Sequence, residues 1–211
     1  MKNFKQLFAA VVTLGVLSFS GHVVAAEVEA PEALVKRISQ EVLDIAKADK
    51  AIQNGSQQRV LQVVEEKILP FVDFKKMTAL AAGRFWRNAT PEQQQALTTQ
   101  FRSLLVYTYS GAISQVRDQK VEFLPMRSMP ADVDVEVRSR VLQSRGEPLQ
   151  LNYRLEKTEA GWRIYDVNVL GAWLVETYKS TFAAEISRGG VDGLIKALTD
   201  KNKSLAAKSS S

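Results

Sequence analysis

The chain has 211 residues, with 28 Lys and Arg against 23 Asp and Glu, so its formal net charge is +5. It contains no Cys and a single His, His22, which excludes disulfide bonds, Cys–His nucleophiles and the zinc sites that Cys and His build together. Because the basic excess is small and forms no run of like charge, nucleic acid is not expected as a partner.

The N-terminal residues predict a secretory signal peptide, residues 1–26. Lys2 and Lys5 form its positive end, an apolar run follows from 7 to 19, and small residues precede the expected cleavage site. The apolar run is shorter than the ~20 residues that a membrane-spanning helix needs. Cleavage would remove His22, and with it any Ser–His–Asp triad or histidine-bound haem. We therefore expect a soluble, exported chain in the periplasm.

Apolar residues at helical spacing predict four helices in the first half of the mature chain. The first covers residues 31–48, and a second ends at Pro70. A short third helix covers residues 74–82. The fourth is the longest, with Thr90 as its N-cap and its end near Val116.

Between residues 119 and 170 the apolar residues recur at every second position, which predicts strands. Val135 and Val137 alternate with charged residues, and so do Leu151 and Tyr153 in the next segment. Short turn sequences separate these segments. The pattern predicts a four-stranded antiparallel sheet with one apolar face and one charged face.

Helical periodicity returns in residues 172–203, where a Gly-Gly pair separates two predicted helices. Residues 204–211 end in a serine run and are expected to form a disordered tail. A helical part in residues 31–116, followed by a sheet and then by further helices, is typical of the α+β class. We therefore predict a single domain that covers residues 27–203.

Two aspartates are candidates for catalysis, and each also has a structural interpretation. Asp73 directly precedes the helix at 74–82, where its carboxylate can accept from free backbone N–H groups as an N-cap. Asp166 lies in an apolar strand. It could be a general base that faces a cavity, a polar residue on the other face of the strand, or a residue tied to Arg163. No metal site is indicated.

The longest predicted helix is apolar on more than one side, as Phe101 and Tyr109 illustrate. A surface helix needs only one apolar stripe, so this helix is either buried between two layers or lines a cavity. The first C-terminal helix repeats the pattern with Tyr178 and Phe182. Both helices could pack onto the apolar face of the sheet and leave a gap between them.

Two segments resemble one known family. The segment "ILPFVDFKKMTALAAGRFWRNATPEQQQALTTQFRSLLVYTY" resembles the central region of the MlaC proteins, also called toluene-tolerance auxiliary transport proteins, and "GWRIYDVNVLGAWLVETYKSTFAAEISRGGVDGLIKAL" resembles their C-terminal region. The resemblance covers nearly the whole mature chain in the same order. Its motifs are a P-x-x-D-F, a W-R before the longest helix and a Y-D-V-x-V-x-G before the last helices. One departure is that Ala172 and Trp173 follow that Gly, where the family has a Ser.

The resemblance implies a periplasmic phospholipid carrier, not an enzyme. Such a carrier shuttles lipid between an outer-membrane lipoprotein–porin complex and the MCE-domain ring of an inner-membrane ABC transporter, and so maintains outer-membrane lipid asymmetry. The implied fold is an NTF2-like variant, in which about six helices wrap a four-stranded curved antiparallel sheet and enclose an apolar cavity. We expect a monomer that carries phospholipid and needs no cofactor.

Two alternatives stay open at this point. One is an NTF2-like enzyme that acts on a small apolar substrate with Asp166 as its base. The other is a periplasmic interaction module with a filled core. The sequence leaves open the preferred head group, the number of acyl chains, the direction of transport and the surfaces that bind partners.

For a carrier, the expected contacts of the acyl chains are apolar residues from the helices and strands. These residues are Phe71, Phe74, Met77, Phe101, Leu105, Tyr109, Ile113, Val135, Val137, Leu151, Tyr153, Val167, Val169, Leu174, Tyr178 and Phe182. Four basic residues are expected to face the head group or a partner, and these are Lys120, Arg138, Arg140 and Arg145.

Overall fold

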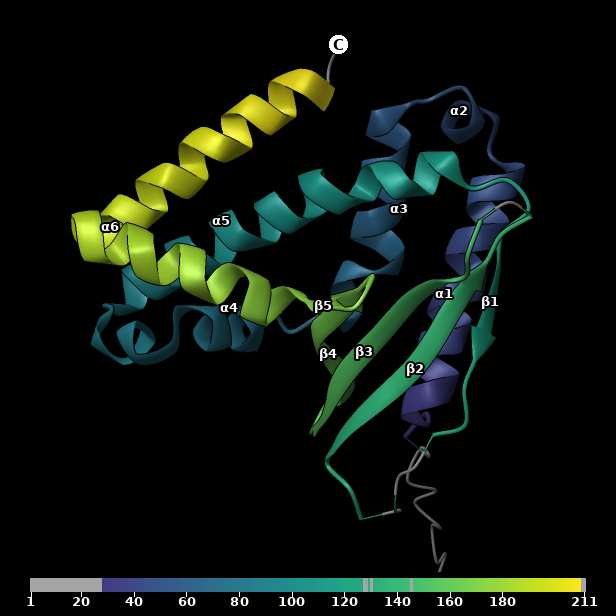
Figure 1. Ribbon diagram of the computed structural model, residues 1–211, viewed down its shortest axis with the longest axis horizontal. Coiled ribbons are helices and arrows are strands. Elements are labelled where there is room, and N and C mark those ends of the chain that lie inside the picture. Colours follow the sequence, from purple (N-terminus) through teal and green to yellow (C-terminus); the bar gives the residue numbers. More distant parts are fainter. Residues whose placement is uncertain (1–27, 127–128, 130, 145, 210–211) are drawn as a thin grey trace, which may run out of the picture.

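The computed structural model describes residues 28–126, 129, 131–144 and 146–209 (Figure 1). The predicted signal peptide, residues 1–26, lies outside this part of the chain. Among the helices that are described, none combines the length and the apolarity that a bilayer crossing requires. Helices precede and follow one antiparallel sheet, so the α+β class predicted from the sequence is confirmed.

The first helices follow the local sequence signals. α1 spans Pro31–Ala48, α2 spans Lys50–Gln53 and α3 spans Gln57–Lys67, and the short 3-10 helix η1 covers Leu69–Phe71. The carboxylate of Asp49 accepts two backbone N–H groups of α2, at 2.9 and 3.3 Å. The proline in η1 cannot donate a backbone hydrogen bond, which explains why α3 ends before it.

The helix α4, Phe74–Ala82, begins at Asp73. The Oδ1 of Asp73 accepts a hydrogen bond of 2.8 Å from the backbone N–H of Lys76, so the N-cap interpretation of this aspartate is confirmed. Gly83 ends the helix with a φ of 58°, which a side chain would disfavour. A 3-10 segment, η2, covers Gly83–Asn88.

The helix α5, Pro91–Tyr109, starts with a capping box in which Thr90 and Gln93 satisfy each other's backbone N–H groups. The sequence predicted an end near Val116. The regular helix ends earlier, and the tighter 3-10 helix η3 takes over at Ser110–Gln115. The Ser-Gly pair at this change disfavours a continued α-helix, because both residues have low helix propensity.

The sheet has five strands in the order β1-β2-β3-β4-β5, all antiparallel to their neighbours. The strands are β1 Lys120–Phe123, β2 Asp134–Leu142, β3 Leu149–Thr158, β4 Gly161–Val169 and β5 Ala172–Trp173. Four of them were predicted. The fifth has only two residues and pairs with the end of β4, and so short a strand leaves no detectable alternation in the sequence.

Strand β4 contains one bulge. Arg154 faces Asp166 across the β3–β4 ladder and Leu155 faces Ile164, so Tyr165 is the extra residue between the two pairs. The bulge lets the apolar residues before and after it lie on the same face of the sheet. Asp166 therefore lies on the opposite face, beside Arg154.

The last helix, α6, covers Leu174–Ser209 and bends at Gly189 and Gly190, whose backbone is not helical. Its two halves correspond to the two predicted helices and fold back on each other at one end of α5 (Figure 1). The sequence suggested a disordered tail for residues 204–211. The helix instead continues through its last described residue, because Leu205 packs against the neighbouring helices.

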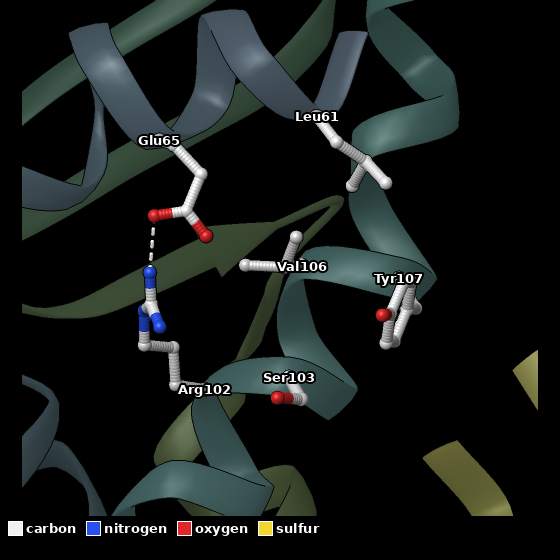
Figure 2. Close-up of a pocket in the computed structure, with 6 residues that line it drawn as sticks. All are labelled: Leu61, Glu65, Arg102, Ser103, Val106 and Tyr107. Carbon is white, nitrogen blue, oxygen red and sulfur yellow. Dashed lines mark hydrogen bonds and ion pairs between the residues drawn. The ribbon is translucent and has the colours of Figure 1, made fainter. Parts of the chain in front are cut away.

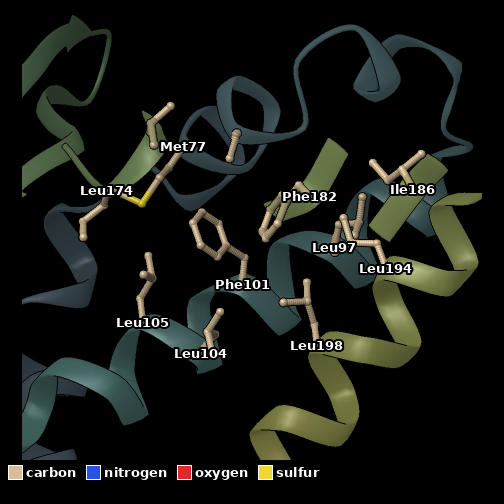
Figure 3. Close-up of a cluster of buried hydrophobic side chains, with 12 residues drawn as sticks. Met77, Leu97, Phe101, Leu104, Leu105, Leu174, Phe182, Ile186, Leu194 and Leu198 are labelled. Carbon is tan, nitrogen blue, oxygen red and sulfur yellow. The ribbon is translucent and has the colours of Figure 1, made fainter. Parts of the chain in front are cut away.

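Three clusters of buried apolar side chains hold the fold together. We call the first the helical core, which is made by α4, α5 and α6 (Figure 3): Met77, Ala81, Leu97, Phe101, Leu104, Leu105, Leu174, Val175, Phe182, Ile186, Leu194 and Leu198. The sheet core joins α1 to the sheet: Leu34, Val35, Ile38, Val135, Val137, Leu155, Trp162 and Ile164. The N-terminal core joins α1, α2, α3 and the end of η3: Leu43, Ala46, Ile52, Val60, Val63, Val64 and Val116.

Candidate functional site

An unfilled space remains between α1 and the apolar face of the sheet, next to η3. Its volume is about 540 Å³. The residues that line it are Val35, Ile38, Ser39, Val42, Leu43, Ile68, Ala112, Ile113, Gln115, Val116, Gln119, Val121, Val141, Gln143, Leu149, Gln150, Leu151, Tyr153, Ile164, Val169 and Leu170. We call this space the cavity.

The lining of the cavity is almost entirely apolar. Apart from Ser39, Tyr153 and four glutamines, each described residue that lines it has an aliphatic side chain, and none is charged. Such a space can replace water around a hydrocarbon chain. Its chemistry is therefore that of a binding site for an apolar ligand.

The helical period of α1 and the strand period of the sheet direct these side chains toward the same cavity. Along α1, Val35, Ile38 and Val42 recur at helical spacing and so lie on one side of the helix. In the sheet, Leu151 faces Val169 across the β3–β4 ladder, and both point toward α1. Because strand side chains alternate between faces, Leu149, Leu151 and Tyr153 reach the cavity from the same face of β3, while Gln150 lies at its rim.

One hydroxyl group lies within this apolar lining. The Tyr153 hydroxyl forms hydrogen bonds with the side chains of Ser39 and Ser139, and burial raises the pKa of Tyr153 to about 12. The Ser139 hydroxyl also donates to the backbone carbonyl of Leu151. The hydroxyl is thus satisfied within the protein and leaves the cavity without a free polar group at this position.

The cavity opens to solvent on the side where lining residues are exposed. Leu149 is 38% exposed and Leu170 is 66% exposed, and glutamines 115, 119, 143 and 150 complete the rim. Leu170 has a φ of 54°, a left-handed conformation that is uncommon for a bulky residue. Its backbone N–H donates to the carbonyl of Gln150 at 3.1 Å, which ties the end of β4 to β3 at the rim.

Of the residues chosen from the sequence, four line the cavity. These are Ile113, Leu151, Tyr153 and Val169. Val135, Val137, Val167 and Phe71 lie beside it in or against the sheet core. They support the wall and do not line the space.

The remaining apolar residues chosen from the sequence lie elsewhere. Met77, Phe101, Leu105, Leu174 and Phe182 belong to the helical core, where they contact each other (Figure 3). Phe74 and Tyr178 pack against that core, and Tyr109 forms a hydrogen bond with Tyr178.

The gap expected between the longest helix and the C-terminal helix is filled by the protein's own side chains. The Phe101 ring centroid lies 5.0 Å from those of Phe182 and Tyr178. This packing leaves the cavity on the side of α1 instead.

Sequence reasoning missed the contribution of α1 and of strands β1 and β2. Ile38 and Val42 belong to the helical spacing that predicted the helix at 31–48, and Val121 and Val141 belong to the alternating pattern that predicted strands. Either signal could have marked a cavity wall, but both are equally typical of a packed core.

The basic residues chosen from the sequence do not line the cavity. Lys120, Arg138 and Arg140 alternate with inward-facing residues of β1 and β2, so they lie on the other face of the sheet. Arg140 pairs with Glu122 at 2.8 Å, and Arg138 donates to the carbonyl of Pro125. Arg145 lies outside the described residues.

A different cation lies at the rim. The Nζ of Lys47 donates to the backbone carbonyl of Gln119 at 2.8 Å, and Gln119 lines the cavity. Lys47 is exposed and close enough to Asp118 to help lower the pKa of that carboxyl, after the hydrogen bond from Ser144.

Asp166 has a structural place in the fold. Its Oδ1 accepts backbone N–H groups from Val167 at 2.9 Å and from Val175 at 3.0 Å, at the start of α6. Its other oxygen lies 3.5 Å from Arg154, whose guanidinium stacks on Trp173. Burial raises the pKa of Asp166, which the two N–H groups partly offset. The carboxylate does not line the cavity, so it is not placed to act as a base there.

A second, smaller pocket of about 90 Å³ lies between α3 and α5 (Figure 2). It is lined by Leu61, Glu65, Arg102, Ser103, Val106 and Tyr107, and an ion pair joins Glu65 to Arg102 across it. Its volume is too small for a long hydrocarbon chain. Within the part of the chain that the structure describes, no group of three or more acidic, His or Cys side chains could hold a metal ion.

The chain is similar to proteins named for phospholipid transport and toluene tolerance. The chain is 21% identical over 136 residues to the intermembrane phospholipid transport system binding protein MlaC of Haemophilus influenzae, which is 63% of this chain and 64% of that protein. The chain thus spans slightly less than two thirds of that relative. It is 23% identical over 165 residues to the toluene tolerance protein ttg2D of Pseudomonas putida, or 78% of this chain and 76% of that one.

One solved structure is much more similar. The phospholipid-binding protein from Ralstonia solanacearum, solved in complex with a phospholipid, shares 49% identity and superposes with a TM-score of 0.79, covering 83% of this chain and 98% of that one. The sequence model of the family described as MlaC protein matches residues 36–200. The resemblance noted in the sequence is therefore confirmed, and the chain belongs to the MlaC family.

Proposed function

We propose that this protein is a phospholipid carrier, and that it holds acyl chain in the cavity between α1 and the sheet. The observation that carries the proposal is the lining of that cavity, which is mostly aliphatic and free of charged side chains. The proposal is also supported by the protein from Ralstonia solanacearum that was solved in complex with a phospholipid and is 49% identical to this chain.

The energetics favour transport inside a protein. Each buried methylene stabilises the bound state by ~0.8 kcal/mol relative to water, so an acyl chain with about 14 of them resists release into water by roughly 11 kcal/mol. Moving the same chain from a bilayer into an aliphatic cavity exchanges one apolar environment for another and changes its free energy little. A carrier of this kind can therefore exchange lipid in either direction without a nucleophile, a metal or a nucleotide.

The proposed tail contacts are the four predicted residues that line the cavity, Ile113, Leu151, Tyr153 and Val169, together with residues of α1. The head group would lie outside the rim, where glutamine amides offer uncharged hydrogen bonds and Lys47 offers a positive charge. The basic residues Lys120, Arg138 and Arg140 lie on the face of the sheet opposite the cavity, so we do not assign them to the head group.

The wider role follows from family membership. We propose a periplasmic location after export, and transfer of lipid between complexes of the outer and inner membranes, consistent with relatives named for intermembrane phospholipid transport and toluene tolerance. Contacts with an outer-membrane lipoprotein–porin complex and with an MCE-domain ring, and the maintenance of lipid asymmetry, belong to the same proposal. We assign the protein no catalytic role.

Native mass spectrometry of protein purified from the periplasm without detergent tests the proposal. We expect a mass increment that matches phospholipid, and lipid extraction should identify it. A chain that is lipid-free, and stays so after incubation with phospholipid vesicles, would refute the proposal. Turnover of a small apolar substrate by that lipid-free chain would favour the enzyme alternative instead.

A further inference from the structure

The turn between β4 and β5 places an exposed leucine at the mouth of the cavity. Leu170 lines the cavity and is 66% exposed. Leu149, at the start of β3, also lines it and is 38% exposed. The backbone N–H of Leu170 donates to the carbonyl of Gln150 at 3.1 Å, so the two leucines lie on neighbouring strand ends. We call Leu149 and Leu170 the lip.

The backbone conformation of Leu170 does not suit a leucine. Its φ of 54° is left-handed, and in the described part of the chain every other residue with a positive φ is a glycine. A bulky side chain makes this conformation unfavourable, whereas glycine and asparagine adopt it readily. The fold therefore holds strain at this position, and such strain gathers at functional sites.

The turn itself does not depend on the leucine side chain. It is closed by the backbone N–H of Leu170 and by that of Gly171, which donates to the Oδ1 of the buried Asn168 at 2.9 Å. Leu170 is not a member of the helical core, the sheet core or the N-terminal core. An asparagine would keep the same turn without the strain. The place of the leucine at the cavity mouth offers another explanation.

An apolar side chain at the mouth changes how an acyl chain crosses it. Glutamines 115, 119, 143 and 150 complete the rim beside the lip. A chain that is part-way across exposes methylenes to water, and each exposed methylene lowers the population of that intermediate about fourfold. The lip covers some of these methylenes. It lowers the barriers to entry and to release equally, because both processes pass through the same intermediate.

We propose that the lip is the threshold over which acyl chains pass, and that Leu170 sets the rate of lipid exchange more than the affinity for lipid. A chain that is fully inside is covered by deeper residues such as Val35 and Ile38, which are 2% and 7% exposed. The mostly exposed Leu170 adds little to that state. This inference rests on the proposed function and concerns the kinetics of exchange, whatever the number of chains held.

Leu170→Asn tests the inference, because asparagine fits the turn but offers no apolar surface. Uptake of pyrene-labelled phosphatidylcholine from vesicles, and its release to unlabelled vesicles, are followed by fluorescence. We expect both rates to fall about fourfold for each methylene that the leucine covers, while equilibrium occupancy stays within about twofold of the unaltered value. In chemical denaturation the variant should be at least as stable as the unaltered protein, because the strain is relieved.

Two control variants separate the lip from other effects. Leu170→Met keeps an apolar side chain at the mouth and should exchange lipid at close to the unaltered rate. Val133 is another exposed aliphatic residue, at 59%, but it does not line the cavity, so Val133→Asn should leave both rates unchanged. If Leu170→Asn fails to fold, Leu149→Gln tests the lip from β3, with the same loss of rate expected.

Unchanged rates in Leu170→Asn would overturn the inference. So would a fall in occupancy as large as the fall in uptake, with release unchanged, because Leu170 would then be an ordinary contact of the bound chain. Lower stability of Leu170→Asn would show that folding requires the leucine, and would also overturn it. If the unaltered protein takes up no labelled lipid, the proposed function itself fails, so the two failures are distinct.

Discussion

Leu151→Glu is the most direct test that the cavity holds acyl chain. Leu151 lines the cavity from β3 and is only partly buried, so water can hydrate a carboxylate there and the fold should survive. Bound lipid would displace that water. The substitution therefore opposes lipid binding and leaves folding largely unaffected, unlike a charge at Val137, which is 1% exposed within the sheet core.

Lipid binding can either bury the ionised carboxylate or protonate it, and the process that costs less free energy sets the loss of affinity. An ionised carboxylate buried against an acyl chain costs several kcal/mol. Protonating it instead costs about 3.7 kcal/mol at pH 7, because the ordinary pKa of Glu is ~4.3. Protonation is the cheaper route, so ionisation lowers the affinity at pH 7 by at most about 500-fold, in addition to the loss that an uncharged polar side chain causes at this position. At pH 5 the same cost is about 1 kcal/mol, and the loss shrinks to about fivefold.

The sign of the pH dependence follows from the same reasoning. Bound lipid raises the pKa of Glu at position 151, so binding is weakest at neutral pH and recovers as the pH falls toward 5. Phosphatidylcholine is the appropriate ligand, because its head-group charge does not change in this range. The assay is lipid occupancy by native mass spectrometry, with thermal melts to verify folding.

Leu151→Gln is the matched control. The glutamine side chain has nearly the same shape as that of glutamate but cannot ionise. The loss of lipid affinity in this variant should therefore be the same at pH 5 and pH 7. The reasoning is refuted if Leu151→Glu binds lipid like the unaltered protein at pH 7, or if its deficit does not shrink on acidification while the glutamine variant stays constant.

Three further outcomes are expected. Phe101→Ala should destabilise the protein by about 3–5 kcal/mol in chemical denaturation, because this ring fills the helical core. The amount of lipid bound per folded molecule should not change. Reduced lipid occupancy would instead indicate that Phe101 contacts the lipid. Asp166→Ala leaves two backbone N–H groups and Arg154 without their partner, so stability should fall by about 3 kcal/mol while lipid binding persists; loss of lipid at full stability would contradict this. The pKa of Tyr153, raised to about 12, implies that its share of stability is complete below pH 10 and is lost as the pH rises through 12. Between pH 9 and 11 the unaltered chain should therefore lose about 1.3 kcal/mol more than Tyr153→Phe, and equal losses would refute the burial of this hydroxyl.

Much of the secondary structure was predictable because its signals are local. The N-cap at Asp73, the capping box that begins at Thr90 and the break at Gly189 and Gly190 each depend on residues within one turn of the chain. β5 escaped prediction because two residues cannot display a period. The tail after residue 203 was mispredicted because Leu205 becomes helical through a contact with a distant helix.

The candidate site was harder to predict, because a cavity and a core are built from the same kinds of residue. Phe101 and Phe182 have the apolar character expected of a lipid contact, yet they fill each other's space at 5.0 Å. Leu151 and Val169 have the same character, and they face a space that no side chain fills. Periodicity reports which side of an element is apolar, but not what covers that side.

The sequence by itself determined the order of the elements, the apolar sides of the helices and strands, and the absence of thiols from the chemistry. It did so because backbone propensity, capping and alternation act between near neighbours. The tertiary structure alone decided where the apolar sides meet closely and where they do not. The cavity lies beside the sheet core and the N-terminal core, where α1 and the sheet do not pack closely, and that arrangement depends on the packing of residues far apart in the chain.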